Sequence, residues 1–420
     1  MKFSGLPQHF RQNSAATQAE QAKPLRGPEP AVRDILGREG IILAGIVAAE
    51  PLLEARQAAL RARGEGRLAG LNWMTEDWIE RATDPVQFLA GARSVVMVGL
   101  PCHSNEPAAP GGDGRARGRI ARYARGRDYH RVFESKLRRA ARAIRDELRA
   151  GARATVDYGP LLERPLAALA GVGWQGKSTM LLVPGAGPWV MLGAIATTLE
   201  LEPGEALRKS CGSCERCIAA CPTGAISAGG GEVDARLCIS YHTIENRGVI
   251  PLGLRGRMGD HVFGCDECLE SCPVGAGTWE CYREFEPATI EYARPVLREL
   301  LALDEEQFAG RYRGRAIMRA KRDGLVRNAC IALGNVGDEG DFNALTGALD
   351  DASPLVRGHA AWAIGRLGRR TGARGWERAL VARAILEKDA WVSEEIKLAL
   401  AEASVGGPYG RIDHAGATAD

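Results

Sequence analysis

Eight of the eleven cysteines fall in one stretch of the chain, at a spacing that could hold metal. The stretch begins with a run at Cys211, Cys214, Cys217 and Cys221, and Pro222 follows directly. This spacing lets one short loop present three thiolates to a single iron–sulfur cube, while the fourth cysteine points to a neighbouring cube. The run therefore predicts a [4Fe–4S] cluster with a second cluster close by.

A second, incomplete run lies at Cys265, Cys268 and Cys272, again followed by a proline. Its missing first cysteine would fall at Val262, which cannot bind iron, and Cys238 upstream can replace it. Exchanging the fourth ligand between the runs gives two complete sets, Cys211, Cys214, Cys217 and Cys272 for one cluster and Cys221, Cys238, Cys265 and Cys268 for the other. A zinc ribbon also uses paired C-x2-C knuckles, but it needs neither a triple run nor two Cys-Pro closures. The spacing favours two [4Fe–4S] clusters.

Length and composition bound the class of protein. At 420 residues the chain should contain two or three domains, and its 45% apolar and 25% charged residues are typical of globular proteins. No apolar run approaches the ~20 residues of a membrane span. Because the N-terminus also lacks a hydrophobic signal region, we expect a cytoplasmic protein with no membrane partner. A reducing compartment would keep the cysteine thiolates available for metal.

Strands that alternate with helices predict an α/β domain over residues 31–205. Short apolar runs at 40–49 and 92–100 are typical of buried strands. Residues 52–63 and 77–82 have the spacing of helices.

One stretch has the letters of a phosphate-binding loop, Gly171–Thr179. Such a loop requires a strand before it and a helix after it. Here an alanine-rich helical stretch precedes it at 165–170, and an apolar strand follows at 180–183. The order is reversed, so we do not predict a nucleotide site.

An acid lies where a strand should end, in the sequence Val156-Asp157-Tyr158-Gly159-Pro160. An Asp in this position is usually a turn former or a helix cap. From these residues alone, both a structural and a catalytic role remain open for Asp157. The lone histidines His130 and His261 are expected to be structural.

A loose repeat of about thirty residues fills the C-terminal part of the chain. Leu325–Gly334 resembles Leu355–Gly365, and a weaker third copy begins at Trp391. Amphipathic helices at this period predict a HEAT-like helical stack. Basic residues gather at 311–327, where Asp323 is the only acid, which predicts an anionic partner.

Several motifs together resemble the epoxyqueuosine reductase family. They are Arg81–Pro85, Gly118–His130, Val156–Arg164, Gly171–Lys177, Cys238–Glu245, Phe263–Cys268, Arg327-Asn328 and His359–Trp362. They follow the family's order over about residues 35–400. The resemblance implies an enzyme that reduces epoxyqueuosine to queuosine in the anticodon loop of tRNA. Electrons would pass through two [4Fe–4S] clusters to cobalamin.

The fold that this resemblance implies is a multi-domain α/β protein. Its cobalamin-binding α/β domain would resemble that of reductive dehalogenases, and a ferredoxin-like two-cluster domain and C-terminal HEAT-like α-helical repeats would follow. The expected boundaries are a mobile tail over 1–30, the α/β domain over 31–205, the cluster domain over 206–282, the helical tRNA-binding domain over 283–405 and a second tail over 406–420. The expected partners are a tRNA with a queuosine-type anticodon base and an electron donor protein or small reductant, and we expect a monomer.

The resemblance also implies roles for individual residues. In the family, an Asp in the motif V-D-x-G-P is the proposed proton donor, and this motif falls on Asp157. Partial burial above the corrin would raise the pKa of its carboxyl group. Cobalamin contacts are implied at Arg81, Asp157, Leu181, Leu192, Ser240, Cys265, Asp266, Glu267 and Cys268. Cobalamin is expected base-off and without a protein His ligand, because the pattern D-x-H-x-x-G fails at His130 and His261. Contacts with tRNA phosphates are predicted at Arg247, Arg313, Arg315, Lys321, Arg322, Arg327 and Arg357.

Two other classes of function compete with this interpretation. One is a paralogous cobalamin and iron–sulfur reductase for another substrate, such as a small organohalide. The sequence departs from the family's usual residues at Tyr158, Gln175, Ser178 and Val274-Gly275. The other is an electron-transfer module whose repeats bind a protein. The repeats favour a macromolecular substrate, and the matches around Asp157 favour an enzyme.

Overall fold

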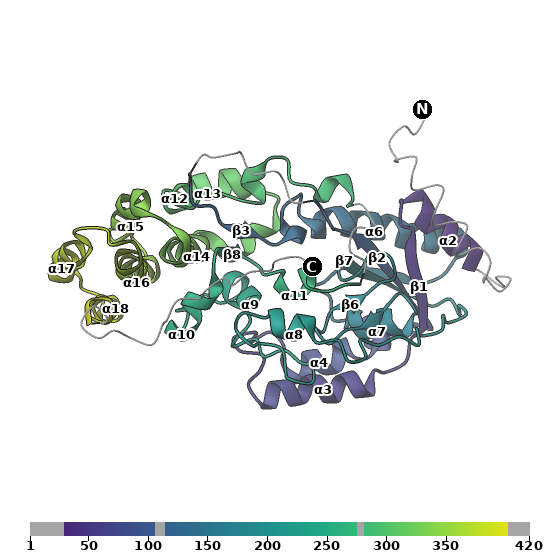
Figure 1. The fold of residues 1–420 in the computed structure, drawn as a ribbon. Helices are drawn as coiled ribbons and strands as arrows, with labels where there is room; N and C mark the ends of the chain where they lie inside the picture. Colours follow the sequence, from purple (N-terminus) through teal and green to yellow (C-terminus); the bar gives the residue numbers. More distant parts are fainter. Residues whose placement is uncertain (1–28, 106–113, 275–280, 402–420) are drawn as a thin grey trace, which may run out of the picture.

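The computed structural model describes residues 29–105, 114–274 and 281–401 (Figure 1). The predicted tails lie almost entirely outside these residues. In the described ranges, no helix combines the length and the apolar character that crossing a bilayer requires.

The centre of the N-terminal half is a four-stranded antiparallel sheet of order β1-β2-β7-β4. Its strands are β1 (Leu43–Ala48), β2 (Ser94–Pro101), β4 (Ala152–Thr155) and β7 (Val190–Thr197). The strands predicted at 40–49 and 92–100 are confirmed as β1 and β2. Apolar runs become strands here because the sheet is covered on both faces.

Helices lie on both sides of the sheet (Figure 1). They are α2 (Glu29–Arg38), α3 (Leu53–Gly64), α4 (Glu76–Ala82), α5 (Pro85–Phe88), α6 (Tyr129–Leu148) and α7 (Glu163–Leu169). On one face, Val96 and Val98 of β2 pack in one apolar cluster with Phe133 of α6. On the other face, Val95 packs in a second cluster with Leu166 of α7. Alternate residues of one strand thus serve two cores.

The segment that resembles a phosphate loop follows α7 and contains the short strand β5 (Trp174–Gln175), and the short strand β6 (Leu181–Leu182) comes after it. The order is helix before and strand after, as the sequence predicted.

The cysteine segment has short helices, α8 (Arg216–Ala220), α9 (Ile239–Ile244), α10 (Leu252–Arg255) and α11 (Glu267–Glu270), and the strand β8 (His261–Phe263). β8 pairs in parallel with β3 (Arg119–Ile120), which precedes α6. One apolar cluster includes Ile120, Phe263 and Leu297, so it joins this segment to the helices that follow.

The C-terminal part is helical, at the left of Figure 1. Its helices are α12 (Leu297–Leu301), α13 (Glu305–Tyr312), α14 (Lys321–Val336), α15 (Phe342–Ala348), α16 (Pro354–Thr371), α17 (Trp376–Leu386) and α18 (Ala390–Ala401). Residues 283–312 contain two 3-10 turns and two short helices, because Pro295 disfavours helix before it and Asp304 begins α13 with a capping box.

The three repeat copies fall on α14, α16 and α18, which pack in that order. Glycines allow the close approach: a Cβ on Gly358 of α16 would lie 2.3 Å from the Trp391 ring of α18. A Cβ on Gly334 of α14 would lie 2.9 Å from the Cα of Ala363.

Candidate active site

Asp157 lies in the loop after β4, at the point where the sequence predicted a strand end. Its φ of +57° is in the left-handed region, which Asp tolerates better than most residues. Its backbone N–H donates to Oε1 of Glu163 at 2.8 Å. Its side chain is 58% exposed, and Oδ2 accepts a hydrogen bond from the Tyr129 hydroxyl at 2.7 Å. The carboxylate is therefore held in place but open to an incoming substrate.

His130, in the first turn of α6, joins Asp157 to a second acid. Its Nε2 lies 3.1 Å from Oδ2 of Asp157, and its Nδ1 lies 2.8 Å from Oδ1 of Asp128. Asp128 also caps α6 by accepting the backbone N–H of His130. The ring of Tyr129 stacks on the imidazole at 4.0 Å. We call Asp128, Tyr129, His130 and Asp157 the acid cluster.

The acid cluster shifts the pKa values of its own members. Burial acts to raise the pKa of Asp157, but hydrogen bonds from His130 and Tyr129 outweigh it and hold the pKa below its ordinary value. Partial burial acts to lower the pKa of His130, but its two acidic partners raise that pKa to about 9. At neutral pH the carboxylate is ionised and the imidazole carries the proton. The pKa of Asp157 therefore lies below its ordinary value in the protein alone, and the rise expected above a bound corrin stays a prediction.

Glu163, at the start of α7, is a further acid that sequence reasoning missed. Burial raises the pKa of its carboxyl group to about 8, although the hydrogen bond from the Asp157 N–H opposes this shift. The motif Val156–Arg164 contains Glu163, which was the one signal available. His130 had a similar signal in the Asp128-x-His130 sequence at a helix start.

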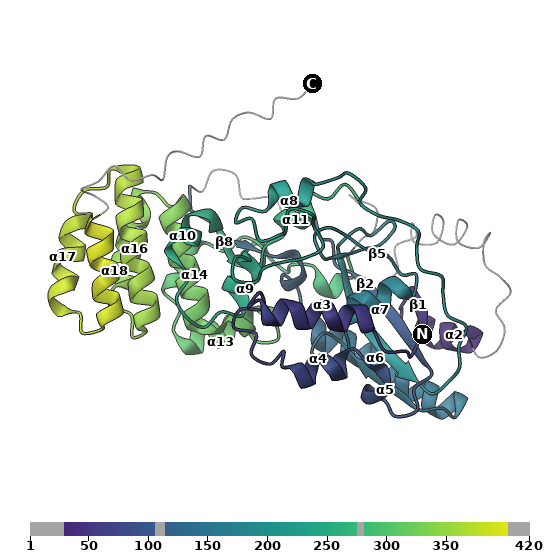
Figure 2. The ribbon, with the colours of Figure 1, turned by 90° about the horizontal axis from the view of Figure 1, so that it is seen from below.

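The structure brings together the first predicted set of cysteines. Cys211 and Cys214 precede α8, which contains Cys217, and Cys272 follows α11. Figure 2 shows these two helices side by side. Burial raises the pKa of Cys272, and the negative charges of Cys211 and Cys214 raise it further. Burial and the charges of Cys211 and Cys272 do the same for Cys217. Thiols that repel one another in this way would be stabilised by a shared cation.

The second predicted set also lies together. Burial raises the pKa of Cys268 to about 12, with contributions from Cys238 and Cys221. Burial and the charges of Cys268 and Cys238 raise the pKa of Cys265. Within the described residues, no three His, Cys, Asp or Glu side chains could hold a single metal ion. A four-iron cube is larger than one ion, so its ligands lie further apart. The arrangement fits two cubes, and the assignment of individual ligands stays a prediction.

Backbone N–H groups point at two of these sulfurs. The N–H of Lys177 donates to Sγ of Cys211 at 3.4 Å, and that of Ala225 donates to Sγ of Cys221 at 3.2 Å. Hydrogen bonds to sulfur are one of the means by which a protein sets a cluster's reduction potential. The segment with phosphate-loop letters therefore contacts the cysteine centre.

The residues expected to touch cobalamin have varied surroundings. Arg81 pairs with Asp77 at 2.7 Å and is half exposed. Leu181 and Leu192 are buried in the apolar cluster beneath the sheet. The hydroxyl of Ser240 donates to the carbonyl of Cys265 at 3.5 Å.

The carboxylates of the Cys265–Cys268 loop already have partners. Asp266 accepts the N–H of Arg122 at 2.8 Å, and Glu267 pairs with Arg119 at 2.7 Å. Tyr123 connects this loop to the acid cluster, because its ring lies 5.8 Å from that of Tyr129 and 6.3 Å from that of Phe263, two residues before Cys265.

Three residues predicted to bind tRNA phosphates already have partners within the protein, which argues against that role for them. Arg327 is 1% exposed and donates to the carbonyl oxygens of Asn246 and Gly248 at 2.8 and 2.7 Å. Arg322 pairs with Asp351 at 2.8 Å, and Arg357 pairs with Glu387 at 2.8 Å. The acids come from other segments of the helical part, so a count of neighbours along the chain missed them.

Two more of the predicted residues bind the backbone of other segments. Arg247 donates to the carbonyl of Ala320 at 3.1 Å. Arg315 donates to the carbonyls of Arg125 and Gly126 at 2.8 and 2.9 Å, and its guanidinium lies over the Tyr292 ring.

Only Arg313 and Lys321 of the predicted set are exposed side chains with no hydrogen bond or ion pair within the described residues.

Comparison with known proteins identifies the family. Residues 82–158 match the model described as "Epoxyqueuosine reductase QueG, DUF1730", and residues 210–275 match the "4Fe-4S double cluster binding domain". An epoxyqueuosine reductase of Xanthomonas campestris is 36% identical over 82% of this chain and 99% of its own length. The chain belongs to the epoxyqueuosine reductase family. The Escherichia coli enzyme of that name is 36% identical over 72% of this chain and 80% of its own.

Solved structures of epoxyqueuosine reductases share the fold. One, in complex with an epoxyqueuosine-modified tRNA-Tyr stem loop, has a TM-score of 0.83 and 28% identity, and the match covers 90% of this chain and 99% of that one. An epoxyqueuosine reductase from Streptococcus thermophilus gives a TM-score of 0.79 at 27% identity, over 90% of this chain and 99% of its own. The matched residues 82–158 contain the whole acid cluster.

Proposed function

We propose that this protein reduces epoxyqueuosine to queuosine in tRNA. The observation that carries the proposal is the family relationship, which extends over nearly the full length of the Xanthomonas enzyme. The site is consistent with it, because cysteines suited to two clusters lie in the same molecule as an exposed, hydrogen-bonded acid.

Removing the epoxide oxygen takes two electrons and two protons, and the oxygen leaves as water. Iron–sulfur clusters deliver electrons one at a time, and the two cysteine sets provide for two clusters. Bound cobalamin would supply the centre that accepts these electrons and acts on the strained ring. The protein's own part is to bind the nucleoside, to orient it and to supply the protons.

The acid cluster is suited to deliver a proton. At neutral pH the proton is on His130, whose Nε2 lies 3.1 Å from Asp157. Asp157 is the exposed member of the cluster, so we assign it the transfer of a proton to the departing oxygen. His130 is the group that supplies this proton to Asp157. Tyr129 fixes the carboxylate through its hydroxyl.

Cobalamin should lie between the acid cluster and the Cys265–Cys268 loop. The Tyr123 ring lies 5.8 Å from that of Tyr129 and 6.3 Å from that of Phe263, so the two regions are neighbours. Ser240, already bonded to Cys265, is retained as a contact. Because the side chains of Leu181 and Leu192 are buried, we propose that only their backbone faces the cofactor.

The finer description of the fold also belongs to this proposal. The packing order α14, α16 and α18 supports HEAT-like repeats that help to hold tRNA. The domain boundaries and the likeness of the α/β domain to reductive dehalogenases stay predictions.

The exchange of ligands between the cysteine runs can be tested by iron content. Anaerobically reconstituted protein should hold about eight irons, and Cys238→Ala should hold about four. Cys330→Ala, which removes a buried cysteine of α14 outside both sets, is the matched control. An unchanged iron content in Cys238→Ala would contradict the exchange.

The function itself is tested in cells. Transfer RNA from a strain that lacks this protein should accumulate epoxyqueuosine, and the parent gene should restore queuosine. A gene carrying Asp157→Asn should not. Queuosine at the normal level in the deletion strain, with no second copy of the gene, would contradict the proposal.

A further inference from the structure

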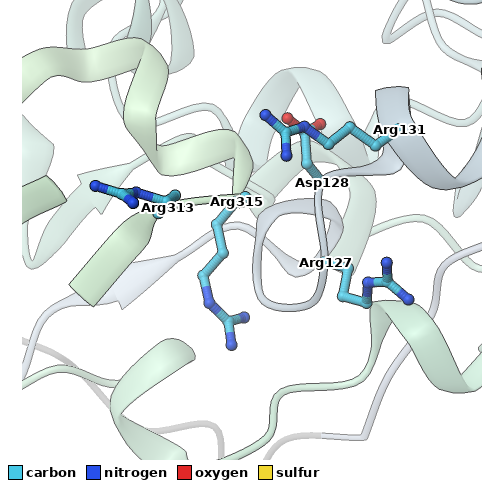
Figure 3. Close-up of a pocket in the computed structure, with 6 residues that line it drawn as sticks. Arg127, Asp128, Arg131, Arg313 and Arg315 are labelled. Atoms are coloured by element: carbon cyan, nitrogen blue, oxygen red, sulfur yellow. The ribbon is translucent and has the colours of Figure 1, made fainter. Parts of the chain in front are cut away.

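A basic pocket lies between the start of α6 and the turn after α13. Its volume is about 200 Å³, and Figure 3 shows the side chains around it. The lining residues are Arg127, Asp128, Arg131, Arg313, Gly314 and Arg315. Two chain segments nearly two hundred residues apart therefore contribute positive charge to one cavity.

The arginines of this pocket divide into two kinds. Arg315 is fixed, because it donates to two backbone carbonyls and lies over an aromatic ring. Arg127, Arg131 and Arg313 are exposed, and none forms a side-chain hydrogen bond or an ion pair within the part of the chain that the structure describes. In Figure 3, the side chain of Arg313 extends to the left, that of Arg127 extends to the right, and that of Arg131 lies next to Asp128.

The single acid of the pocket does not neutralise this charge. Asp128 is engaged by the imidazole of His130 at 2.8 Å and by the α6 backbone. The charge of Arg131 helps to lower the pKa of Asp128, but His130 contributes more to that shift. Burial opposes it. Three guanidinium groups around a small cavity repel one another unless an anion binds.

The pocket adjoins the acid cluster through Asp128. From Asp128 the contacts run to His130 and from His130 to Asp157. An anion in this pocket would therefore be held one short hydrogen-bond chain away from the proposed proton donor. In a nucleic acid, each nucleotide also has a phosphate group close to its base on either side. A phosphate in this pocket could therefore belong to the same RNA as a base that lies at Asp157.

We propose that this pocket binds a backbone phosphate of the RNA next to the nucleotide that enters the active site. The inference rests on the proposed function and adds a phosphate site to it. A guanidinium group can bind two phosphate oxygens at once. A phosphate, which has more acceptor oxygens than a carboxylate, is therefore the ligand that best suits a cavity with several arginines. Arg127 and Arg313 approach from the two segments, and Arg131 adds charge from α6. Bound RNA would then connect the helical part to the α/β domain.

The test compares two double variants in the full chain with both clusters. Arg127→Gln with Arg313→Gln removes two charges from the pocket. Arg33→Gln with Arg142→Gln removes two charges from exposed positions on α2 and α6 that have no hydrogen bond or ion pair within the described residues. Binding of an anticodon stem-loop RNA is measured over a range of salt concentrations, together with iron content and reduction of epoxyqueuosine by the parent.

We expect the pocket variant to bind the RNA at least about tenfold more weakly. Its salt dependence should be flatter by a slope of roughly 0.7 for each lost contact. The control variant should match the parent, and iron content should be unchanged in both. If the parent binds and reduces the RNA but the pocket variant has the same affinity and slope as the control, the phosphate site is contradicted and the proposed function stands. If inorganic phosphate competes with RNA for the control but not for the pocket variant, the site is supported directly. A parent that neither binds nor reduces the RNA would overturn both.

Discussion

Arginines are abundant both in the helical part and around the pocket at the start of α6, but their surroundings and their roles differ between the two regions. In α14 and α16, Arg322, Arg327 and Arg357 each have carboxylate or carbonyl partners and are largely buried. Around the pocket, Arg127 and Arg313 are exposed and form no such bonds within the described residues. A partnered arginine stabilises the fold, and an unpartnered, exposed one remains able to bind an anion.

The largest effect should come from the most buried arginine. Arg327→Met leaves the carbonyls of Asn246 and Gly248 without their donor, which should lower the free energy of unfolding by about 3 kcal/mol or more. Arg313→Met should change it by less than about 0.5 kcal/mol, because the side chain is exposed. Urea unfolding of both variants checks this. Equal stabilities would break the distinction between the two regions.

The acid cluster is a third arrangement, in which charges pair with each other at an accessible position. Asp157→Asn keeps the shape of the side chain but removes the carboxylate that passes a proton from His130 to the substrate, so turnover should fall by about 10² or more. The measurement is single-turnover reduction of epoxyqueuosine RNA with pre-reduced cofactors. RNA affinity should stay at the parent's value. Near-normal turnover would make Asp157 a turn residue.

The pairing inside the acid cluster should be visible as a titration. Two acids raise the pKa of His130 to about 9 from its ordinary 6.5. Because the folded pKa is raised, the pair's contribution to stability is complete below pH 6.5 and is lost as the pH rises through about 9. An NMR titration of the imidazole should give this value.

Asp157→Asn and Asp128→Asn should each bring the pKa of His130 down towards the ordinary value. If the imidazole titrates near 6.5 in the parent, His130 is mostly neutral at pH 7 and cannot be the group that supplies the proton to Asp157.

The smallest effect on RNA binding should come from the ion pairs of the helical part. Arg322→Gln breaks the pair with Asp351, whose side chain is 7% exposed and would be left without its partner, so the free energy of unfolding should fall by about 3 kcal/mol. RNA affinity and its salt slope should not change, unlike those of the pocket variant. A loss of RNA affinity without a loss of stability would place Arg322 back among the phosphate contacts.

Features that depend on local spacing were predictable from the sequence. The two cysteine runs are recognised from intervals of a few residues, and β1 and β2 follow from apolar runs. The helix before and the strand after residues 171–179 were predicted for the same reason. Asp157 was identified through the family resemblance, since its own neighbours suggested only a turn.

Features that depend on contacts between distant segments were not predictable in the same way. His130 was taken as a lone histidine because Asp157 lies 27 residues away. Arg322 and Arg357 were assigned to RNA because their acids, Asp351 and Glu387, lie about thirty residues further along. Repeated helices bring such residues together, and a charge count along the chain cannot register it.

The most direct test of the account is the reaction itself. Purified protein with reconstituted clusters and cobalamin is mixed anaerobically with a low-potential reductant and a stem-loop RNA that carries epoxyqueuosine, and the nucleoside is analysed by mass spectrometry. We predict that the nucleoside loses one oxygen atom and becomes queuosine, and that Asp157→Asn slows this step by about 10² or more. If the bound RNA keeps its epoxide while the clusters are reduced, the central claim is contradicted.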